Sequence, residues 1–65
     1  MKKNEQVEIK SIFMTADEVA HECQISKTSA YRIIKELNEE LRRRGKYTIR
    51  GKINRRFFED MYINI

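Results

Sequence analysis

The sequence predicts a small, mostly α fold with three helices and a short β hairpin, and three observations support this prediction. Residues 16–23 and 27–43 place apolar side chains at helical spacing and follow residues that cap helices well. Residues 55–62 form a third amphipathic segment, after Asn54. Between the second and third segments, residues 47–53 alternate apolar and polar side chains around a glycine, which is typical of a hairpin.

Length and composition limit this chain to one small domain. Its 65 residues, 40% of them hydrophobic, can bury one modest core but leave no room for a large substrate pocket with a catalytic shell. A single cysteine excludes an intramolecular disulfide and a cysteine-rich zinc site. No apolar run reaches membrane-spanning length, and the N-terminus lacks the apolar core of a signal peptide. We therefore expect a flexible tail at residues 1–8, one domain at residues 9–65, and a cytoplasmic location.

The first predicted helix begins with a strong local signal. Thr15 is placed to cap it, and Glu18, three residues later, completes a capping box. Met14 and Val19 are placed as the hydrophobic staple across that cap. The β-branched and aromatic residues of segment 9–14 predict a short strand that leads into the helix.

This helix contains the only histidine and the only cysteine of the chain. His21 has no second histidine to share a metal ion with, so we expect an exposed helix residue rather than a metal ligand or a general base. Cys23 falls on the apolar stripe, where a small residue fits, so a core position is favoured over a reactive thiol.

The second predicted helix has one apolar side and one basic side. Ser26 is a good N-cap for it, and a short turn at residues 24–25 joins it to the first helix. Its apolar stripe consists of Ala30, Ile33, Ile34, Leu37 and Leu41. The opposite side presents Thr28, Arg32 and Lys35, with Tyr31 on its flank. A short polar group, a bidentate donor, a point charge and an aromatic edge can together read base edges in a DNA major groove.

The residues around the turn resemble those of bacterial helix-turn-helix proteins. Val19-Ala20 and the later string ISKTSAYRIIK (residues 25–35) are similar to the pattern VA…VSRSTVYRLIK, above all in the excisionase and MerR-like winged group of phages and integrative elements. The resemblance implies a winged helix-turn-helix fold that places its second helix in the major groove of DNA. One residue departs from the pattern, because that group usually has glycine at the turn where this chain has Gln24. A left-handed backbone at Gln24 costs of order 1 kcal/mol; otherwise the turn differs.

Positive charge is concentrated in the second half of the chain. Residues 27–56 contain eleven basic and three acidic residues, a net charge of +8; because the whole chain carries +4, the remaining residues carry −4. Such segregation is expected of a surface that binds the phosphate backbone. The residues expected to read bases are Thr28, Tyr31, Arg32 and Lys35. The residues expected to contact the DNA backbone are Lys27, Arg43, Lys46, Arg50, Lys52, Arg55 and Arg56.

Residues 47–53 are the predicted wing. We expect the apolar side chains of Tyr47, Ile49 and Ile53 to face inward, and those of Thr48, Arg50 and Lys52 to face outward. Gly51 supplies the turn. The outward side chains include two cations that can lie along a phosphate backbone or enter a minor groove, whereas a solvated hairpin is the alternative.

The last predicted helix, residues 55–62, is capped by Asn54 and completes the core with the side chains of Phe57, Phe58, Met61 and Tyr62. Arg55 and Arg56 occupy its first turn, where cations are electrostatically unfavourable. A phosphate bound at that N-terminus would reverse the penalty, so the placement favours a role in DNA binding.

From these features we expect sequence-specific, non-catalytic binding to double-stranded DNA, with no cofactor, metal or small-molecule substrate. By resemblance, the role is that of an excisionase, which partners an integrase or recombinase or self-associates on DNA, or that of a small phage repressor. A protein-interaction module that uses the same fold to bind a host or phage protein is the alternative from another class. An enzyme is disfavoured, because the sequence has no recognisable carboxylate pair, glycine-rich phosphate loop or catalytic triad.

Overall fold

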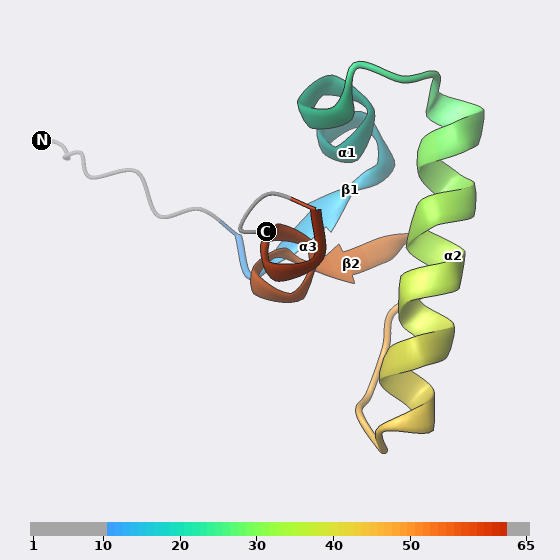
Figure 1. The fold of residues 1–65 in the computed structure, drawn as a ribbon, viewed down its shortest axis with the longest axis vertical. Helices are drawn as coiled ribbons and strands as arrows, with labels where there is room; N and C mark the ends of the chain where they lie inside the picture. Colours follow the sequence, from blue (N-terminus) through green and yellow to red (C-terminus); the bar gives the residue numbers. More distant parts are fainter. Residues whose placement is uncertain (1–10, 63–65) are drawn as a thin grey trace, which may run out of the picture.

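The computed structural model describes residues 11–62. The elements follow the order β1 (Phe13–Thr15), α1 (Ala16–Cys23), α2 (Lys27–Arg43), β2 (Lys52–Asn54) and α3 (Arg55–Tyr62). The predicted fold class is confirmed: three helices and a small two-stranded antiparallel sheet form a winged helix-turn-helix (Figure 1). The predicted tail at residues 1–8 lies outside the described residues. None of the helices within residues 11–62 is long and apolar enough to span a bilayer.

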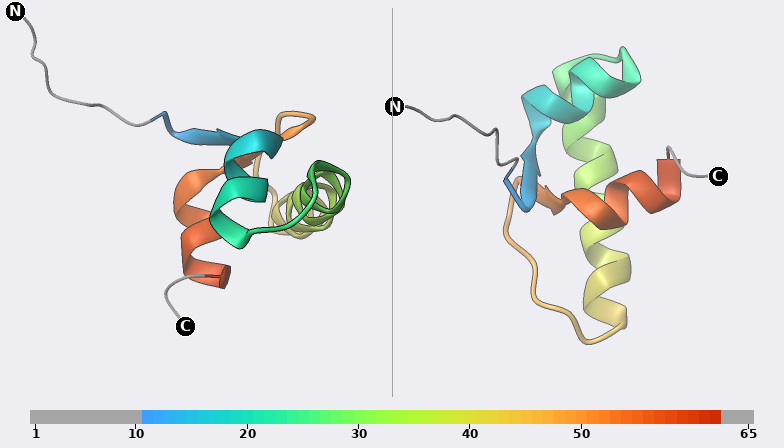
Figure 2. Two further views of the ribbon diagram at one scale, coloured as in Figure 1. Left: turned by 90° about the horizontal axis from the view of Figure 1, so that it is seen from above. Right: turned by 90° about the vertical axis from the view of Figure 1, so that its left-hand side faces the viewer.

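The long helix α2 lies along one edge of the domain. In Figure 1 it runs vertically, with α1, the sheet and α3 all on its left. Seen from above in Figure 2, the other elements again lie on one side of α2, and the loop before β2 passes beside it. Within the described part of the chain, one long side of α2 is therefore covered by no other element.

Helix α1 begins with the predicted capping box. The backbone N–H of Glu18 donates to the Thr15 hydroxyl at 3.3 Å, and the Thr15 N–H donates to the Glu18 carboxylate at 2.9 Å. Met14 and Val19, the predicted staple residues, are both buried in the same core cluster. The N-terminus of α1 is thus fixed by contacts among neighbours in the sequence.

The turn between α1 and α2 has a left-handed backbone at Gln24, with φ 56° and ψ 49°. The N–H of Ile25 donates to the Ala20 carbonyl at 3.0 Å, and that of Gln24 donates to the His21 carbonyl at 3.3 Å. This pair of bonds is the Schellman motif, in which the left-handed position is usually glycine. Among the described residues, Gln24 is the one residue other than glycine that has a positive φ.

Helix α2 has the predicted bounds and the predicted buried stripe. The Ser26 hydroxyl accepts from the N–H of Ser29 at 3.1 Å, which caps its N-terminus. After its C-terminus, Gly45 adopts a left-handed conformation with φ 77°, which glycine accommodates without strain. Four of the five stripe residues are buried and Ile33 is half-buried. The stripe packs with residues of α1, the sheet and α3, which include Val19, Ile53 and Phe58.

The sheet joins two segments that lie far apart in the sequence. Strands β1 and β2 pair antiparallel, with Met14 opposite Ile53, and both of these side chains are fully buried. The strand predicted within residues 9–14 is therefore present at Phe13–Thr15, whereas residues 9 and 10 lie outside the described part. Because the two strands run antiparallel and each leads directly into a helix, α1 and α3 begin at opposite ends of the sheet (Figure 1).

The wing differs from the hairpin expected for residues 47–53. An isolated bridge joins Ile49 to Lys52 across a tight turn, in which Gly51 has φ 78°. Tyr47 is 100% exposed and Ile49 is 46% exposed, so the prediction that these two side chains face inward was wrong. Because β2 pairs with β1, residues 46–48 have no strand partner, and alternation along them does not sort side chains between a buried and an exposed face.

Helix α3 is capped as predicted, because the Asn54 side-chain oxygen accepts from the N–H of Phe57 at 2.8 Å. Phe58 is fully buried and Phe57 is half-buried, in agreement with the expected core face. Met61 and Tyr62 remain exposed, so the prediction that they complete the core was wrong for them. Figure 2 gives the reason: the last turn of α3 extends beyond the sheet and α2.

Candidate nucleic-acid interface

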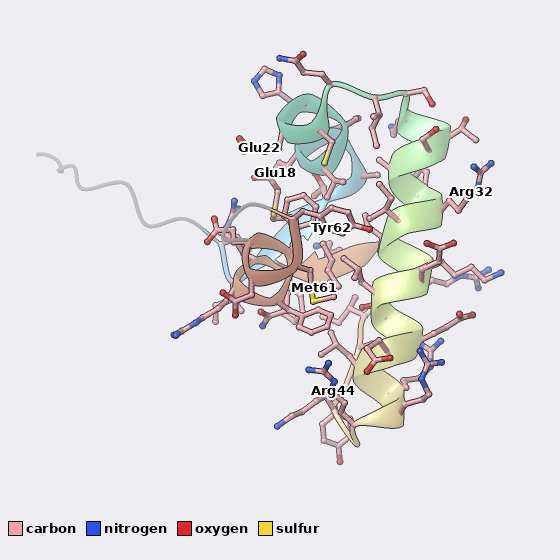
Figure 3. All side chains as sticks on the ribbon, in the orientation of Figure 1. Glu18, Glu22, Arg32, Arg44, Met61 and Tyr62 are labelled. Atoms are coloured by element: carbon pink, nitrogen blue, oxygen red, sulfur yellow. The ribbon has the colours of Figure 1, made fainter. Side chains whose placement is uncertain are left out.

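The uncovered side of α2 presents the side chains predicted to read bases. Thr28, Arg32 and Lys35 are all exposed. Arg32 points away from the rest of the domain (Figure 3). The guanidinium of Arg32 and the ammonium of Lys35 make no hydrogen bond or ion pair with any residue in the described range 11–62. Both cations are thus free of partners within this range and available to bind an external acceptor.

Tyr31, the fourth predicted base-reading residue, lies between this side of α2 and the wing. Its side chain is 50% exposed. One edge of its ring lies beside Gly51. A Cβ atom placed on this glycine would be 3.9 Å from Tyr31 Cε1. The ring therefore packs beside the wing turn while its exposed part remains accessible.

A polar ridge of α2 faces the wing. It consists of Tyr31, Lys35, Asn38 and Arg42, whose spacing of four, three and four residues places them on one side of the helix. The ridge and the wing residues Thr48, Arg50 and Gly51 line an open hollow, which we call the helix–wing hollow. Three of its lining side chains are cationic at neutral pH, so the hollow suits an anionic group such as a phosphodiester.

Asn38 is the member of the ridge that sequence reasoning missed. It is only 4% exposed and is the one polar residue buried among the described residues. Its side-chain nitrogen donates to the Ile49 carbonyl at 3.2 Å and to the Lys52 carbonyl at 2.9 Å. One sequence feature could have indicated its burial: Asn38 lies one helical turn after Ile34, at the edge of the apolar stripe. A polar side chain buried at such a position needs hydrogen-bond partners.

A second side-chain bond links the same ridge to the wing. The Arg42 guanidinium donates to the Thr48 hydroxyl at 3.1 Å, one helical turn beyond Asn38. This bond is exposed, so water competes with it, and it contributes less to the wing's position than the buried amide does.

Six of the seven residues predicted to contact the DNA backbone fall into two groups in the structure. Lys27 pairs with Asp17 at 3.3 Å and Arg43 pairs with Glu40 at 2.6 Å, in exposed ion pairs. A phosphate can displace such pairs at little cost, because exposed pairs contribute only about 0–1 kcal/mol. The other group is exposed and makes no ion pair with any residue of the range 11–62; it consists of Lys46, Arg50, Lys52 and Arg56.

Arg55 is placed differently from the prediction. Its guanidinium donates to the Ser11 carbonyl at 2.8 Å and to the Glu18 carboxylate at 3.0 Å, and its side chain is only 17% exposed. The Arg55 N–H donates to the Ile12 carbonyl at 2.7 Å, and the next-but-one amide of α3 is capped by Asn54. Two of the amides at this N-terminus are therefore already satisfied, and the Glu18 carboxylate offsets the unfavourable cation at Arg55.

The pKa values of three side chains are shifted by their local surroundings. The Thr15 N–H and then the Arg55 guanidinium lower the pKa of Glu18 below its usual range. Hydrogen bonds from Arg43 and Arg44 lower the pKa of Glu40. Burial, and then the Glu22 charge, raise the pKa of the half-buried Cys23 thiol, as expected for an unreactive structural cysteine.

The family assignment comes from the sequence match that covers these elements. The model of the Mga helix-turn-helix domain family matches residues 5–59. The chain belongs to this family. The match extends through α1, the turn, α2, the wing and the first turn of α3, so every described candidate DNA-contacting residue lies within a helix-turn-helix DNA-binding domain. No curated protein and no solved structure matched the chain.

Proposed function

We propose that this Mga-type domain binds double-stranded DNA in a sequence-specific manner and without catalysis. The observation that carries the proposal is the uncovered side of α2, where Arg32 and Lys35 are exposed without partners in the described range. A helix of 17 residues that is bare along one side fits the major groove, which is about 12 Å wide.

Affinity and specificity are assigned to different groups of side chains. Thr28, Tyr31, Arg32 and Lys35 read base edges, with Arg32 as the bidentate donor that suits guanine. The basic residues of the wing, with Lys46 and Arg56, neutralise phosphates and supply most of the affinity. The helix–wing hollow lies between these two groups, where a DNA strand that leaves the major groove would pass.

The finer biological role has two candidates. The sequence resemblance supports an excisionase, which occupies tandem sites and bends DNA together with a recombinase. The match to the Mga helix-turn-helix family supports a regulator of transcription, which occupies an operator. Footprinting across the DNA that surrounds the coding gene distinguishes the two roles, since tandem bent sites near a recombinase gene favour the first and one palindrome at a promoter favours the second.

The DNA-binding proposal is tested by selecting duplexes from a random library with the purified chain. Selected and scrambled duplexes are then titrated by fluorescence anisotropy at several salt concentrations. We expect enrichment of a defined motif, tighter binding to it than to scrambled duplex, and a log K that falls linearly with log salt.

Failure of the DNA-binding proposal has a clear signature in the same experiment. A chain that enriches no motif and shows no salt-dependent affinity for any duplex does not have this function. That result would favour the protein-interaction module, in which the fold serves as a scaffold for a protein partner.

A further inference from the structure

We propose that Asn38 positions the wing for DNA binding by fixing it to the recognition helix α2. The inference rests on the proposed function and deepens it, because it assigns the alignment of the two DNA-contacting parts to one buried side chain. Asn38 itself is buried and touches no DNA in this account, so it acts through the residues of the wing.

The geometry of the bonds makes Asn38 suited to this role. Its side-chain nitrogen carries two hydrogens, so it can donate to two acceptors at the same time. The two acceptors are the carbonyls of Ile49 and Lys52, which stand on either side of the wing turn. One side chain of α2 therefore holds both ends of the turn that carries Arg50.

Few other contacts orient the wing. Within the described range, the turn is closed by the bridge between Ile49 and Lys52, which fixes its internal shape but not its direction relative to α2. The exposed bond between Arg42 and Thr48 is the one other side-chain hydrogen bond from α2 to this loop. Strand β2 is fixed by β1, but that pairing begins only at Lys52, after the turn. Apart from the packing of Tyr31 beside Gly51, the direction of Arg50 thus depends mainly on the buried amide.

Because of the positive charges around Asn38, loss of its hydrogen bonds should lower the affinity for DNA. Lys35 and Arg42 of α2 and Arg50 of the wing converge on the helix–wing hollow, although like charges repel one another. The Asn38 amide holds the wing turn against α2 despite this repulsion. When the amide is removed, the turn is free to move away from the helix, and Arg50 no longer reaches the same phosphates as α2. Lys52 stays in place, because its backbone pairs with β1.

The test compares two asparagine variants that remove different side-chain bonds. Asn38→Leu keeps a side chain of similar size but cannot donate to the wing carbonyls. Asn54→Ala is the matched control, because it removes the cap of α3 without touching the contact between α2 and the wing. Both variants are expected to lower the melting temperature, so stability alone does not separate a positioning role from a structural one.

The salt dependence of DNA binding does separate the two roles. We expect Asn38→Leu, measured where it is fully folded, to weaken selected and scrambled duplexes by the same factor. We also expect it to flatten the slope of log K against log salt by about 0.9, the value for the one phosphate that Arg50 no longer neutralises. Adding Arg50→Ala to this variant should then change the slope little further, whereas Asn54→Ala should leave the slope unchanged.

Two results would overturn the role of Asn38. One is a folded Asn38→Leu chain with the wild-type salt slope. The other is a full additional loss of affinity when Arg50→Ala is added to that variant. If Asn38→Leu does not fold, the milder Asn38→Ser is measured in its place, together with amide exchange at Lys52. Exchange there should accelerate more than in Asn54→Ala, and equal acceleration in both variants would also overturn the proposal.

Failure of the underlying DNA-binding function is recognised separately. A wild-type chain that binds no duplex removes the proposed function and, with it, the role of Asn38 in DNA binding. A wild-type chain that binds DNA with the expected salt slope, combined with an unchanged slope in Asn38→Leu, removes the role of Asn38 alone.

Discussion

The helix-turn-helix unit, residues 15–43, and the second unit, residues 46–62 with the wing, β2 and α3, are held in different ways. In the first unit, each helix start is fixed by a cap within three residues, as at Thr15 and Ser26. In the second, β2 depends on β1, nearly forty residues earlier in the sequence, and the wing turn depends on Asn38. Local contacts thus define the part that enters the groove, and distant contacts define the part that aligns it on DNA.

Because of this difference, we expect mutations in the two units to have different effects. Changes in the helix-turn-helix unit should alter local stability or base reading, whereas changes in the second unit should alter the whole fold or the contacts with the phosphate backbone. The largest effect is expected in the core that joins the two units.

Phe58→Ala should destabilise the domain most. The ring is fully buried in α3 and joins the core of the helix-turn-helix unit to the sheet, so its removal should cost about 3–5 kcal/mol. A chain of this length has a total stability of roughly 3–10 kcal/mol, so the variant should be largely unfolded in mild urea. Urea titration followed by circular dichroism measures the loss. Met61→Ala, an exposed neighbour on α3, is the control, and an equal loss there would contradict the assigned core.

Removing the wing cations should weaken binding to every duplex. The double change Arg50→Ala and Lys52→Ala leaves the backbone bonds to Asn38 in place, so the fold should remain intact. The slope of log K against log salt should flatten by about 0.9 for each phosphate that the variant no longer neutralises. Arg44→Ala is the control, since Arg44 pairs with Glu40 and stacks on Phe57. A slope unchanged by the double substitution would leave the wing as a solvated turn.

Gln24→Gly should stabilise the domain by about 1 kcal/mol, because the left-handed conformation costs glycine nothing. For a domain of this size, that gain corresponds to a rise in melting temperature of about 4–8 °C. Affinity for DNA should not change, since the turn between α1 and α2 is fixed by the same backbone bonds. A lower melting temperature would mean that the Gln24 side chain itself stabilises the turn.

The smallest expected effect is a pH dependence at Glu18. Its pKa is lowered in the folded state, so its stabilising contribution is complete above the unfolded value of about 4.3 and is lost as the pH falls further. Glu18→Gln should therefore lower stability near neutral pH, by less than about 1 kcal/mol because the ion pair is partly exposed. The difference from wild type should shrink on acidification. Thermal melts at several pH values measure it, with Glu39→Gln as the control; a constant difference would contradict the assignment.

The same contrast explains how much the sequence predicted. The bounds of α1 and α2, the capping box and the Asn54 cap were predicted correctly because each depends on residues within a few positions. The inward placement of Tyr47 and Ile49 was wrong because it assumed pairing between sequence neighbours, whereas the sheet joins distant strands.

As with the fold, part of the candidate site was predicted correctly and part was not. Helical periodicity placed Thr28, Arg32 and Lys35 on one exposed side of α2, as the structure shows. Their contacts with bases remain predictions. The partner of Arg55 and the burial of Asn38 were not predicted. Both depend on which distant segments come together in the fold, and a local sequence pattern does not show this.

We propose that α2 reads bases while the wing contacts phosphates, and Arg32→Ala is the sharpest test of this proposal. Binding of the variant and wild type to the selected duplex, to single base-pair variants of it and to scrambled duplex is measured by anisotropy at one salt concentration, with Arg44→Ala as the control. We predict a loss of roughly 1–3 kcal/mol on the selected duplex, relaxed preference at one or two base pairs and little change on scrambled DNA. An equal loss on selected and scrambled duplexes would make Arg32 a phosphate contact and contradict the claim.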